Sequence, residues 1–357
     1  MASNSFGTLF RITTWGESHG SGIGVIVDGC PAAIELNEEM LQKELDRRSP
    51  GSSLYTSPRK EIDAPKILSG VYEGKTTGAP ISIIIENNNV DSSKYEDIKT
   101  LLRPGHANFT YLKKYGIFDY RGGGRASARE TAGRVAAGAV ARQFLNRFAI
   151  KATAYLSAVG KVDFTGTEVD RAFLKTSPLF APNPSAEAEF IREIESAKGA
   201  DDSVGGIVSF IIENMPAGIG EPIYAKLPAL LAYAMLSIPA SKGFEFGEGF
   251  RAASMRGSEH NDGFINIEGG IKPSSNHAGG VLGGISTGEP IFGRVAFKPT
   301  SSINIPQKTV DIEGNSAEFK LPAGSRHDPI VAVRAVPVVE AMSLLVIADS
   351  FLLNCKP

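Results

Sequence analysis

The residues best suited to chemistry in this sequence surround a run of three glycines. Arg121, Arg125 and Arg129 flank Gly122–Gly124, and the residues after them predict a helix. Guanidinium groups that lie close together repel one another unless an anion lies between them. A glycine-rich backbone, a helix start and arginines are together typical of a phosphate or carboxylate site. The segment lacks the P-loop lysine and the dinucleotide-loop spacing, so binding of ATP or ordinary NAD is disfavoured.

All five histidines lie in polar loops. His19 belongs to the turn 16–20 (GESHG), and His106 follows Arg103 in a turn before a helix expected over 107–114. Histidine titrates near neutral pH and suits acid–base catalysis, although either motif alone could be an ordinary turn. The remaining loops contain His277 before Gly279–Gly280, His260 in a turn expected at the surface, and His327 between Arg326 and Asp328.

A further polar loop, residues 298–302 (KPTSS), follows a predicted strand. A lysine beside hydroxyl groups can hold a phosphate or the polar edge of a ring, although a plain turn fits this loop equally well. The scattered histidines lack the spacing of metal ligands, so no metal site is expected.

Hydrophobic periodicity predicts strands and helices mixed along the chain. Strands are expected over 10–14, 23–27, 66–72, 79–86, 153–162, 204–213, 263–270 and 289–297. Helices are expected over 37–48 with Asn37 as its cap, 129–148, 186–198 with Ser185 as its cap, 228–237 and 331–353. In each half of the chain a strand, a glycine-rich loop and a long apolar helix follow one another, which is compatible with a pseudo-symmetric α+β fold.

The composition is that of a globular protein without a strong global charge. The 357 residues are 42 % hydrophobic and 21 % charged, with a net charge of −2, so any affinity for anions must come from local clusters. We expect a single domain over residues 1–357. Two cysteines outside any metal-binding pattern, no signal sequence, and an apolar C-terminal stretch interrupted by charges indicate a cytoplasmic protein.

Taken together, six motifs in their order along the chain resemble those of the chorismate synthases. They are GESHG at 16–20, RPGHA at 103–107, YRGGGRASARET at 120–131, SNHAGGVLGGIS at 275–286, KPTSS at 298–302 and GSRHDP at 324–329. The resemblance extends from about Phe6 to the final helix.

The resemblance implies a specific reaction, cofactor and fold. Chorismate synthase eliminates phosphate from 5-enolpyruvylshikimate-3-phosphate in a 1,4-anti sense to give chorismate. It requires reduced FMN although the reaction is redox-neutral overall. The family fold is a β-α-β sandwich, with helices between antiparallel sheets, and the family enzyme is a homotetramer.

The family roles can be carried over residue by residue. The catalytic positions are His19 near the leaving phosphate, His106 near the reduced flavin, and Asp328 near the flavin N5 and the substrate's C6 proton. The expected substrate-binding residues are Ser18, Arg48, Arg103, Ser127, Arg129 and Arg326. The expected flavin contacts are Arg125, Ala126, Ser127, Pro239, Ala240, Gly283, Lys298, Pro299, Thr300, Ser301, Ser302 and Arg326.

The chain departs from the family pattern at a few positions. Many relatives have basic residues where this chain has Ser49 and Leu54, and some have Asn where it has Pro239. Two alternatives remain: a bifunctional enzyme that also reduces flavin with NADPH, or a non-catalytic phosphometabolite-binding module. The absence of an added domain favours the monofunctional type, supplied with reduced FMN by an external flavin reductase for which NADPH is a candidate reductant. Neither nucleic acid nor a membrane is expected as a partner.

Overall fold

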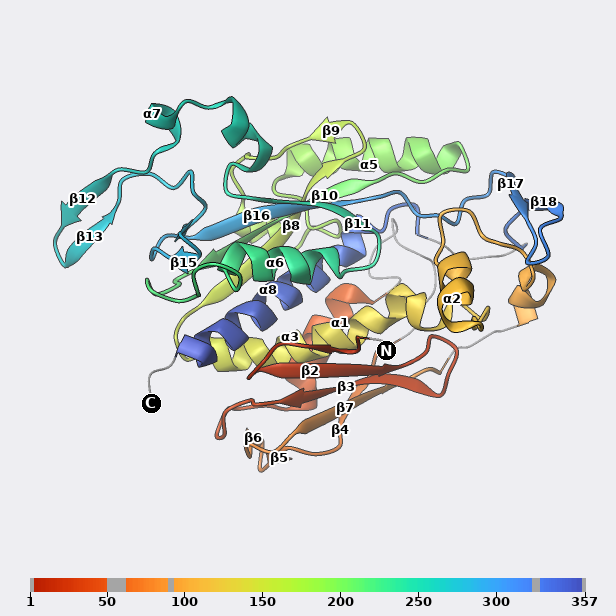
Figure 1. The fold of residues 1–357 in the computed structure, drawn as a ribbon, viewed down its shortest axis with the longest axis horizontal. Coiled ribbons are helices and arrows are strands. Elements are labelled where there is room, and N and C mark those ends of the chain that lie inside the picture. The colour runs from red at the N-terminus through yellow and green to blue at the C-terminus, as the bar shows by residue number, and fades with distance from the viewer. Residues whose placement is uncertain (1–2, 50–61, 89–92, 323–327, 355–357) are drawn as a thin grey trace.

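Two antiparallel sheets enclose a layer of helices (Figure 1). The computed structural model describes residues 3–49, 62–88, 93–322 and 328–354. The first sheet has the order β1 (Ser5–Phe6), β2 (Arg11–Gly16), β3 (Gly22–Asp28), β7 (Ile81–Glu86), β4 (Pro65–Ile67). The second has the order β11 (Ser241–Phe246), β16 (Ile291–Phe297), β10 (Gly206–Glu213), β8 (Lys151–Val159), β9 (Val162–Asp163). This β-α-β sandwich confirms the predicted fold class.

The helix layer consists of α1 (Glu38–Arg48), α3 (Thr131–Asn146), α6 (Leu227–Leu236) and α8 (Ala332–Asn354). Helices α3 and α8 cross closely because Gly138 lies directly against Ala341, where a Cβ atom would have no room. By length and composition α8 could span a membrane, but 83 % of its apolar stretch is buried inside the fold. The helix expected over 331–353 is therefore the central core helix.

Outside these layers lie short helices and two-stranded hairpins. The hairpins are β5 (Val71–Tyr72) with β6 (Lys75–Thr76), β12 (Phe264–Ile267) with β13 (Gly270–Pro273), β14 (Val281–Leu282) with β15 (Ile285–Ser286), and β17 (Gln307–Val310) with β18 (Ser316–Phe319). The helices are α2 (Asn108–Tyr115), α4 (Arg171–Leu174), α5 (Pro184–Gly199), α7 (Gly257–His260), η1 (Ser93–Ile98), η2 (Gly124–Ala126), η3 (Ala128–Glu130) and η4 (Gly249–Ser254).

The two halves of the chain repeat one hydrogen-bonding unit. Thr76 Oγ1 donates to Pro31 O at 2.7 Å and accepts from Ile34 N at 2.9 Å. In the second half, Ser286 Oγ donates to Pro216 O at 2.6 Å and accepts from Ile219 N at 2.9 Å. In both halves a central strand, a Pro-Ala turn, a helix, a tight hairpin and a second central strand follow in this order. The unit gives the predicted pseudo-symmetry a physical basis.

Four predicted element boundaries are wrong. The strand expected over 153–162 ends as β8 at Val159, because Gly160 turns the chain with φ of +55° into β9. The strand expected over 66–72 is divided between β4 and β5, because Gly70 turns the chain with φ of +81°. The strand expected over 263–270 is one arm of a hairpin that turns at Gly269 and Gly270. Asn183, and not Ser185, caps α5, because its side chain accepts from Ala186 N at 2.9 Å while Pro184 fills the first helical position.

Candidate active site

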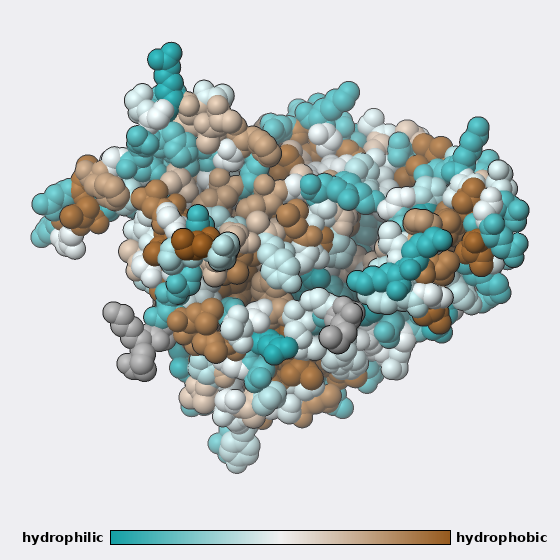
Figure 2. Space-filling view, in the orientation of Figure 1, coloured by the Kyte–Doolittle hydropathy of each residue, from teal (hydrophilic) through white to brown (hydrophobic). Residues whose placement is uncertain are grey.

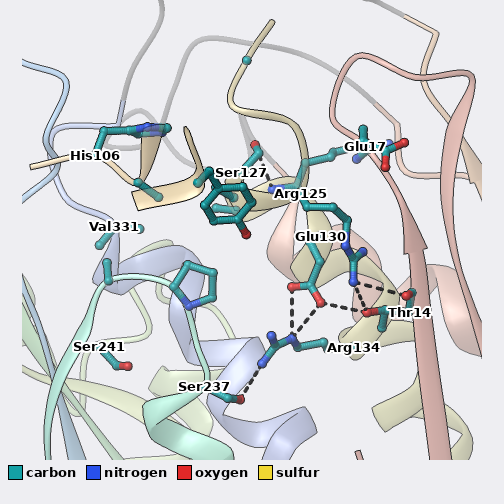
Figure 3. Close-up of a pocket in the computed structure, with 18 of the residues that line it drawn as sticks. Thr14, Glu17, His106, Arg125, Ser127, Glu130, Arg134, Ser237, Ser241 and Val331 are labelled. Atoms are coloured by element: carbon teal, nitrogen blue, oxygen red, sulfur yellow. Dashed lines mark hydrogen bonds and ion pairs between the residues drawn. The ribbon is translucent and has the colours of Figure 1, made fainter. Parts of the chain in front are cut away.

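A cavity of about 1100 Å³ opens at one end of the helix layer. Its lining comes mainly from β2, the turn 103–107, residues 122–134, the end of α6, the loop 298–302 and the start of α8. Segments far apart in the sequence therefore meet there, and most of them belong to the motifs that the sequence singles out (Figure 3).

The triple glycine holds two histidines against its backbone. Gly122, Gly123 and Gly124 all have positive φ values, of 62°, 88° and 53°. A Cβ atom on Gly122 would lie 2.5 Å from His19 Cδ2, and one on Gly123 would lie 3.1 Å from His106 Cε1. Glycine is thus needed here both for the left-handed backbone and for the close approach of the two rings.

Gly122→Ala is expected to lower turnover by about 10²-fold, because the added methyl group displaces His19 and small misplacements of reacting groups are costly. Gly116→Ala is the matched control. Gly116 also has positive φ, of 73°, but a Cβ atom there meets nothing within 4 Å. Steady-state rates of the two variants separate backbone strain from displacement of the ring, and equal rates would rule out the displacement.

His19 lies in the turn between β2 and β3, half-buried, with its ring edge-on to Tyr95 at 5.3 Å between ring centroids. The letters GESHG also match Gly-X-Ser-X-Gly. A hydrolase nucleophile elbow leads from a strand into a helix, whereas this turn leads from one strand into the next. Ser18 is buried and its hydroxyl points to Arg121 O at 3.4 Å, so a hydrolase elbow is not indicated.

A buried carboxylate joins two of the predicted substrate arginines. Asp63 forms ion pairs with both Arg48 and Arg129, and all three side chains are almost fully buried. Burial alone would raise the pKa of Asp63, but the two guanidinium groups outweigh it and lower that pKa to about 2. Burial lowers the pKa of Arg48 to about 10, which still leaves it charged at neutral pH. Both cations thus reach the cavity wall held by one shared anion.

Asp328 lies just before α8, where Arg334 fixes its orientation. Arg334 Nη1 donates to Asp328 Oδ2 at 2.9 Å, and Arg334 Nε donates to Arg48 O at 3.2 Å. Asp328, Arg334 and Arg48 all line the cavity. The ion pair therefore couples the predicted catalytic carboxylate to the predicted substrate arginine.

His106 lies in a strongly cationic environment. Burial, followed by the charges of Arg103 and Lys298, lowers the pKa of His106 to about 3. Its Nδ1 atom is buried and has no hydrogen-bond partner within the described part of the chain. The imidazole is therefore neutral at physiological pH and presents a polar atom that a bound molecule could satisfy.

We expect the His106 ring signals in an NMR titration of the ligand-free protein to stay constant from pH 8 to pH 5. Because the folded-state pKa lies below the ordinary value of 6.5, the unfolded chain takes up a proton first, and stability decreases as pH falls from about 6.5 towards 3. A His106 midpoint near 6.5 would contradict this environment.

The loop 298–302 lies against the turn that contains His106. Lys298 Nζ donates to Gly105 O and to Ser301 Oγ, each at 3.0 Å, and Arg103 Nη2 donates to Ser302 Oγ at 2.8 Å. Thr300 Oγ1 is buried without a partner among the described residues. A lysine, an arginine and several hydroxyl groups thus gather on one wall.

A chain of polar contacts forms another wall of the cavity (Figure 3). Arg125 Nη2 donates to Thr14 Oγ1 at 2.9 Å, and Thr14 Oγ1 donates to Glu130 Oε1 at 3.1 Å. Glu130 also accepts from Arg134 Nε at 3.0 Å, and Arg134 Nη1 donates to Ser237 Oγ at 2.7 Å. The contacts connect β2, α3, the glycine turn and the end of α6.

Comparisons with known proteins agree with this geometry. The sequence matches the family model described as chorismate synthase over residues 10–352. It is 56 % identical to the chorismate synthase of Protochlamydia amoebophila, with 99 % of this chain and 98 % of that protein covered. The chain belongs to the chorismate synthase family. It is also 51 % identical to the chorismate synthase of Archaeoglobus fulgidus, with 98 % of both covered. A crystal structure of chorismate synthase superposes with a TM-score of 0.77 at 32 % identity, covering 98 % of this chain and 93 % of that one.

Most of the residues expected from the family pattern line this one cavity. They are Arg48, Arg103, His106, Arg125, Ala126, Ser127, Arg129, Pro239, Ala240, Lys298, Pro299, Thr300, Ser301, Ser302 and Asp328. Ser18 and His19 lie directly behind Gly122, which lines it. The structure therefore brings the chorismate synthase motifs together, while their individual roles stay predictions.

Other predicted positions lie elsewhere. Gly283 is in the turn between β14 and β15, where the hairpin pairs with the start of α6, and it does not line this cavity. Arg121 pairs with Asp119 at the surface, so only two of the three arginines around the glycines line the cavity. His277 binds Glu248 at 2.8 Å, outside the cavity lining. Arg326, His327 and Leu54 lie outside the described residues.

The residues that hold the catalytic candidates in place were not predicted from the sequence. Asp63, Tyr95 and Arg334 belong to none of the six motifs. Glu130 and Arg134 have the i,i+4 spacing of a helical ion pair, which was a usable signal. Asp63 and Tyr95 contact Arg129 and His19 from segments far apart in the chain, and no local pattern indicates those contacts.

Proposed function

We propose that this chain is a chorismate synthase that eliminates phosphate from 5-enolpyruvylshikimate-3-phosphate to give chorismate, with reduced FMN as its cofactor. The proposal rests on the cavity. Residues from five of the six family motifs line it or lie directly behind its lining. The substrate has one phosphate and two carboxylates, so its site must supply several cations. Arg48, Arg129 and Arg334 supply three of them from one wall.

The residues of the cavity also fit a flavin with a phosphate tail. Lys298 and the hydroxyl groups of 300–302 suit the phosphate, and the buried, unpartnered His106 Nδ1 and Thr300 Oγ1 suit polar atoms of a ligand. When bound, reduced FMN would supply the electron-rich ring that the family reaction requires. Neutral His106 would then bind the ring as a donor or acceptor.

Side chains of this protein are the candidates for the proton transfers. His19, held against Gly122, is the candidate to protonate or neutralise the departing phosphate. Asp328, oriented by Arg334, is the candidate to help remove the C6 proton. Lost together, phosphate and proton leave a new double bond without net oxidation, so the flavin is not consumed.

Phosphate release tests the proposal. The protein, dithionite-reduced FMN and enolpyruvylshikimate phosphate are mixed without oxygen, and free phosphate is measured with time. Phosphate release that depends on the reduced flavin supports the proposal. If no phosphate is released, the chain is instead a non-catalytic phosphometabolite-binding module. A parallel mixture with oxidised FMN and NADPH addresses the second activity. We expect no NADPH oxidation, since a separate reductase is the expected source of reduced flavin.

We also propose that the chain acts as one catalytic domain, in the cytoplasm, and as a homotetramer. The hairpin β12–β13 projects from the body and carries exposed apolar side chains at Phe264, Ile265, Ile267 and Ile271 (Figures 1 and 2). A lone hairpin is marginal in water, so contact with another copy would stabilise it. Light scattering on the purified protein should give four times the chain mass of 37.9 kDa.

A further inference from the structure

The guanidinium of Arg134 faces the cavity but belongs to none of the expected sites. It lines the cavity beside Glu130, Ser237 and Met342. Its Nε atom donates to Glu130, and its Nη1 atom donates to Ser237 Oγ and lies 4.0 Å from Met342 Sδ. Arginine carries five N–H donors, so donors on Nη2 stay available to a molecule in the cavity. Figure 3 shows the side chain reaching across from α3 towards the end of α6.

The neighbouring groups make this wall both apolar and net positive. Phe6 and Tyr233 stack at 5.6 Å between ring centroids, and both line the cavity with Ile12 and Met342. The polar chain there contains two guanidinium groups, of Arg125 and Arg134, and one carboxylate, of Glu130. Apolar surface beside a surplus positive charge suits a flat aromatic ring that carries a negative charge. The compact, polyanionic substrate instead suits the linked group of Arg48, Arg129 and Arg334.

We propose that Arg134 is a binding residue for the reduced flavin ring, and that Glu130 is the positioning residue that holds it. The inference rests on the proposed function. A cation near the N1 edge of a reduced flavin favours its deprotonated, anionic form. Glu130 restrains Arg134 and, through Thr14, connects it to Arg125, while partly neutralising both charges. Replacing the cation and replacing the anion should therefore have opposite effects on flavin ionisation.

The test measures the pKa of N1 of bound reduced FMN, from absorbance as a function of pH without oxygen, in three variants. Arg134→Met should raise this pKa by about one unit, and Glu130→Gln should lower it, since one charge at short range shifts a pKa by about that much. Arg134→Lys should stay near wild type. At pH above the wild-type pKa, Arg134→Met should also weaken the binding of reduced FMN by about tenfold, and that of neutral oxidised FMN less.

Arg192→Met is the matched control, because Arg192 forms a helical ion pair with Glu189 on the solvent-facing side of α5. It should change neither the N1 pKa nor FMN affinity. Shifts in the same direction for Arg134→Met and Glu130→Gln, or loss of substrate affinity with unchanged flavin binding, would overturn the inference. If Arg134→Met does not fold, the inference is tested by Glu130→Gln alone, which should lower the pKa of N1 of bound reduced FMN. If the wild-type protein does not bind reduced FMN, the proposed function itself fails.

Discussion

Replacing His19 with alanine should lower turnover by about 10²-fold or more, the usual loss for an acid–base group. The ring is half-buried and lies against Gly122 and edge-on to Tyr95, beside the cavity and not in the apolar core. The fold should therefore survive its removal. The measurement is phosphate release at saturating reduced FMN, with circular dichroism and thermal unfolding to establish that the variant is folded.

His260→Ala is the control for the loss of an imidazole outside the cavity. His260 ends α7 and stacks loosely near His277, at 6.2 Å between ring centroids. The His260→Ala variant should keep the wild-type rate.

Replacing His106 with alanine should also lower turnover by about 10²-fold. This loss should arise mainly from weaker contact with the flavin, so the affinity for FMN should fall as well. A His19→Ala variant that turns over at the wild-type rate would remove His19 from the chemistry.

Asp63→Asn should lower the free energy of unfolding by about 3–5 kcal/mol, because removing one partner of a buried ion pair leaves a buried charge uncompensated. Arg48 is 1 % exposed, and Arg129 is nearly as buried. Both would lose their shared carboxylate. Urea unfolding at pH 7 measures the change, and weaker substrate binding should accompany it.

The same pair predicts how stability depends on pH. The pKa of Asp63 is lowered from 3.8 to about 2 in the folded protein, so its contribution is present above pH 3.8 and disappears as pH falls towards 2. Asp28→Asn serves as the control, because Asp28 is exposed and, among the described residues, its side chain accepts only from the neighbouring Gly29 N. If Asp63→Asn lowers the free energy of unfolding no more than Asp28→Asn does, the buried ion pairs of Asp63 do not stabilise the fold.

Local patterns predicted the elements whose signals are local. Asn37 caps α1 as expected, accepting from Met40 N at 2.9 Å, and the strands expected over 10–14 and 23–27 are present as β2 and β3. The break at Gly70 was missed because an apolar run across a glycine resembles a continuous strand. The cap of α5 was misplaced because Asn183 and Ser185 are both good caps, and only Pro184 decides between them.

From the sequence, only the site residues that belong to the family motifs could be predicted. The family motifs indicated His106, Arg125 and the loop 298–302, and these line one cavity. The supporting residues could not be found in the same way, because Asp63 reaches Arg129 across 66 positions and Ser237 reaches Arg134 across 103. Such contacts depend on how the sheets and helices pack, and a single sequence does not show that packing.

The most direct test of the central proposal follows product, phosphate and flavin in one anaerobic reaction. Enolpyruvylshikimate phosphate is added to the protein with a substoichiometric amount of reduced FMN, and chorismate, phosphate and the flavin spectrum are recorded together. We predict one phosphate for each chorismate, many turnovers for each flavin, and a flavin that is still reduced at the end. No chorismate, or chorismate that stops when one equivalent of flavin has been oxidised, would contradict the proposed function.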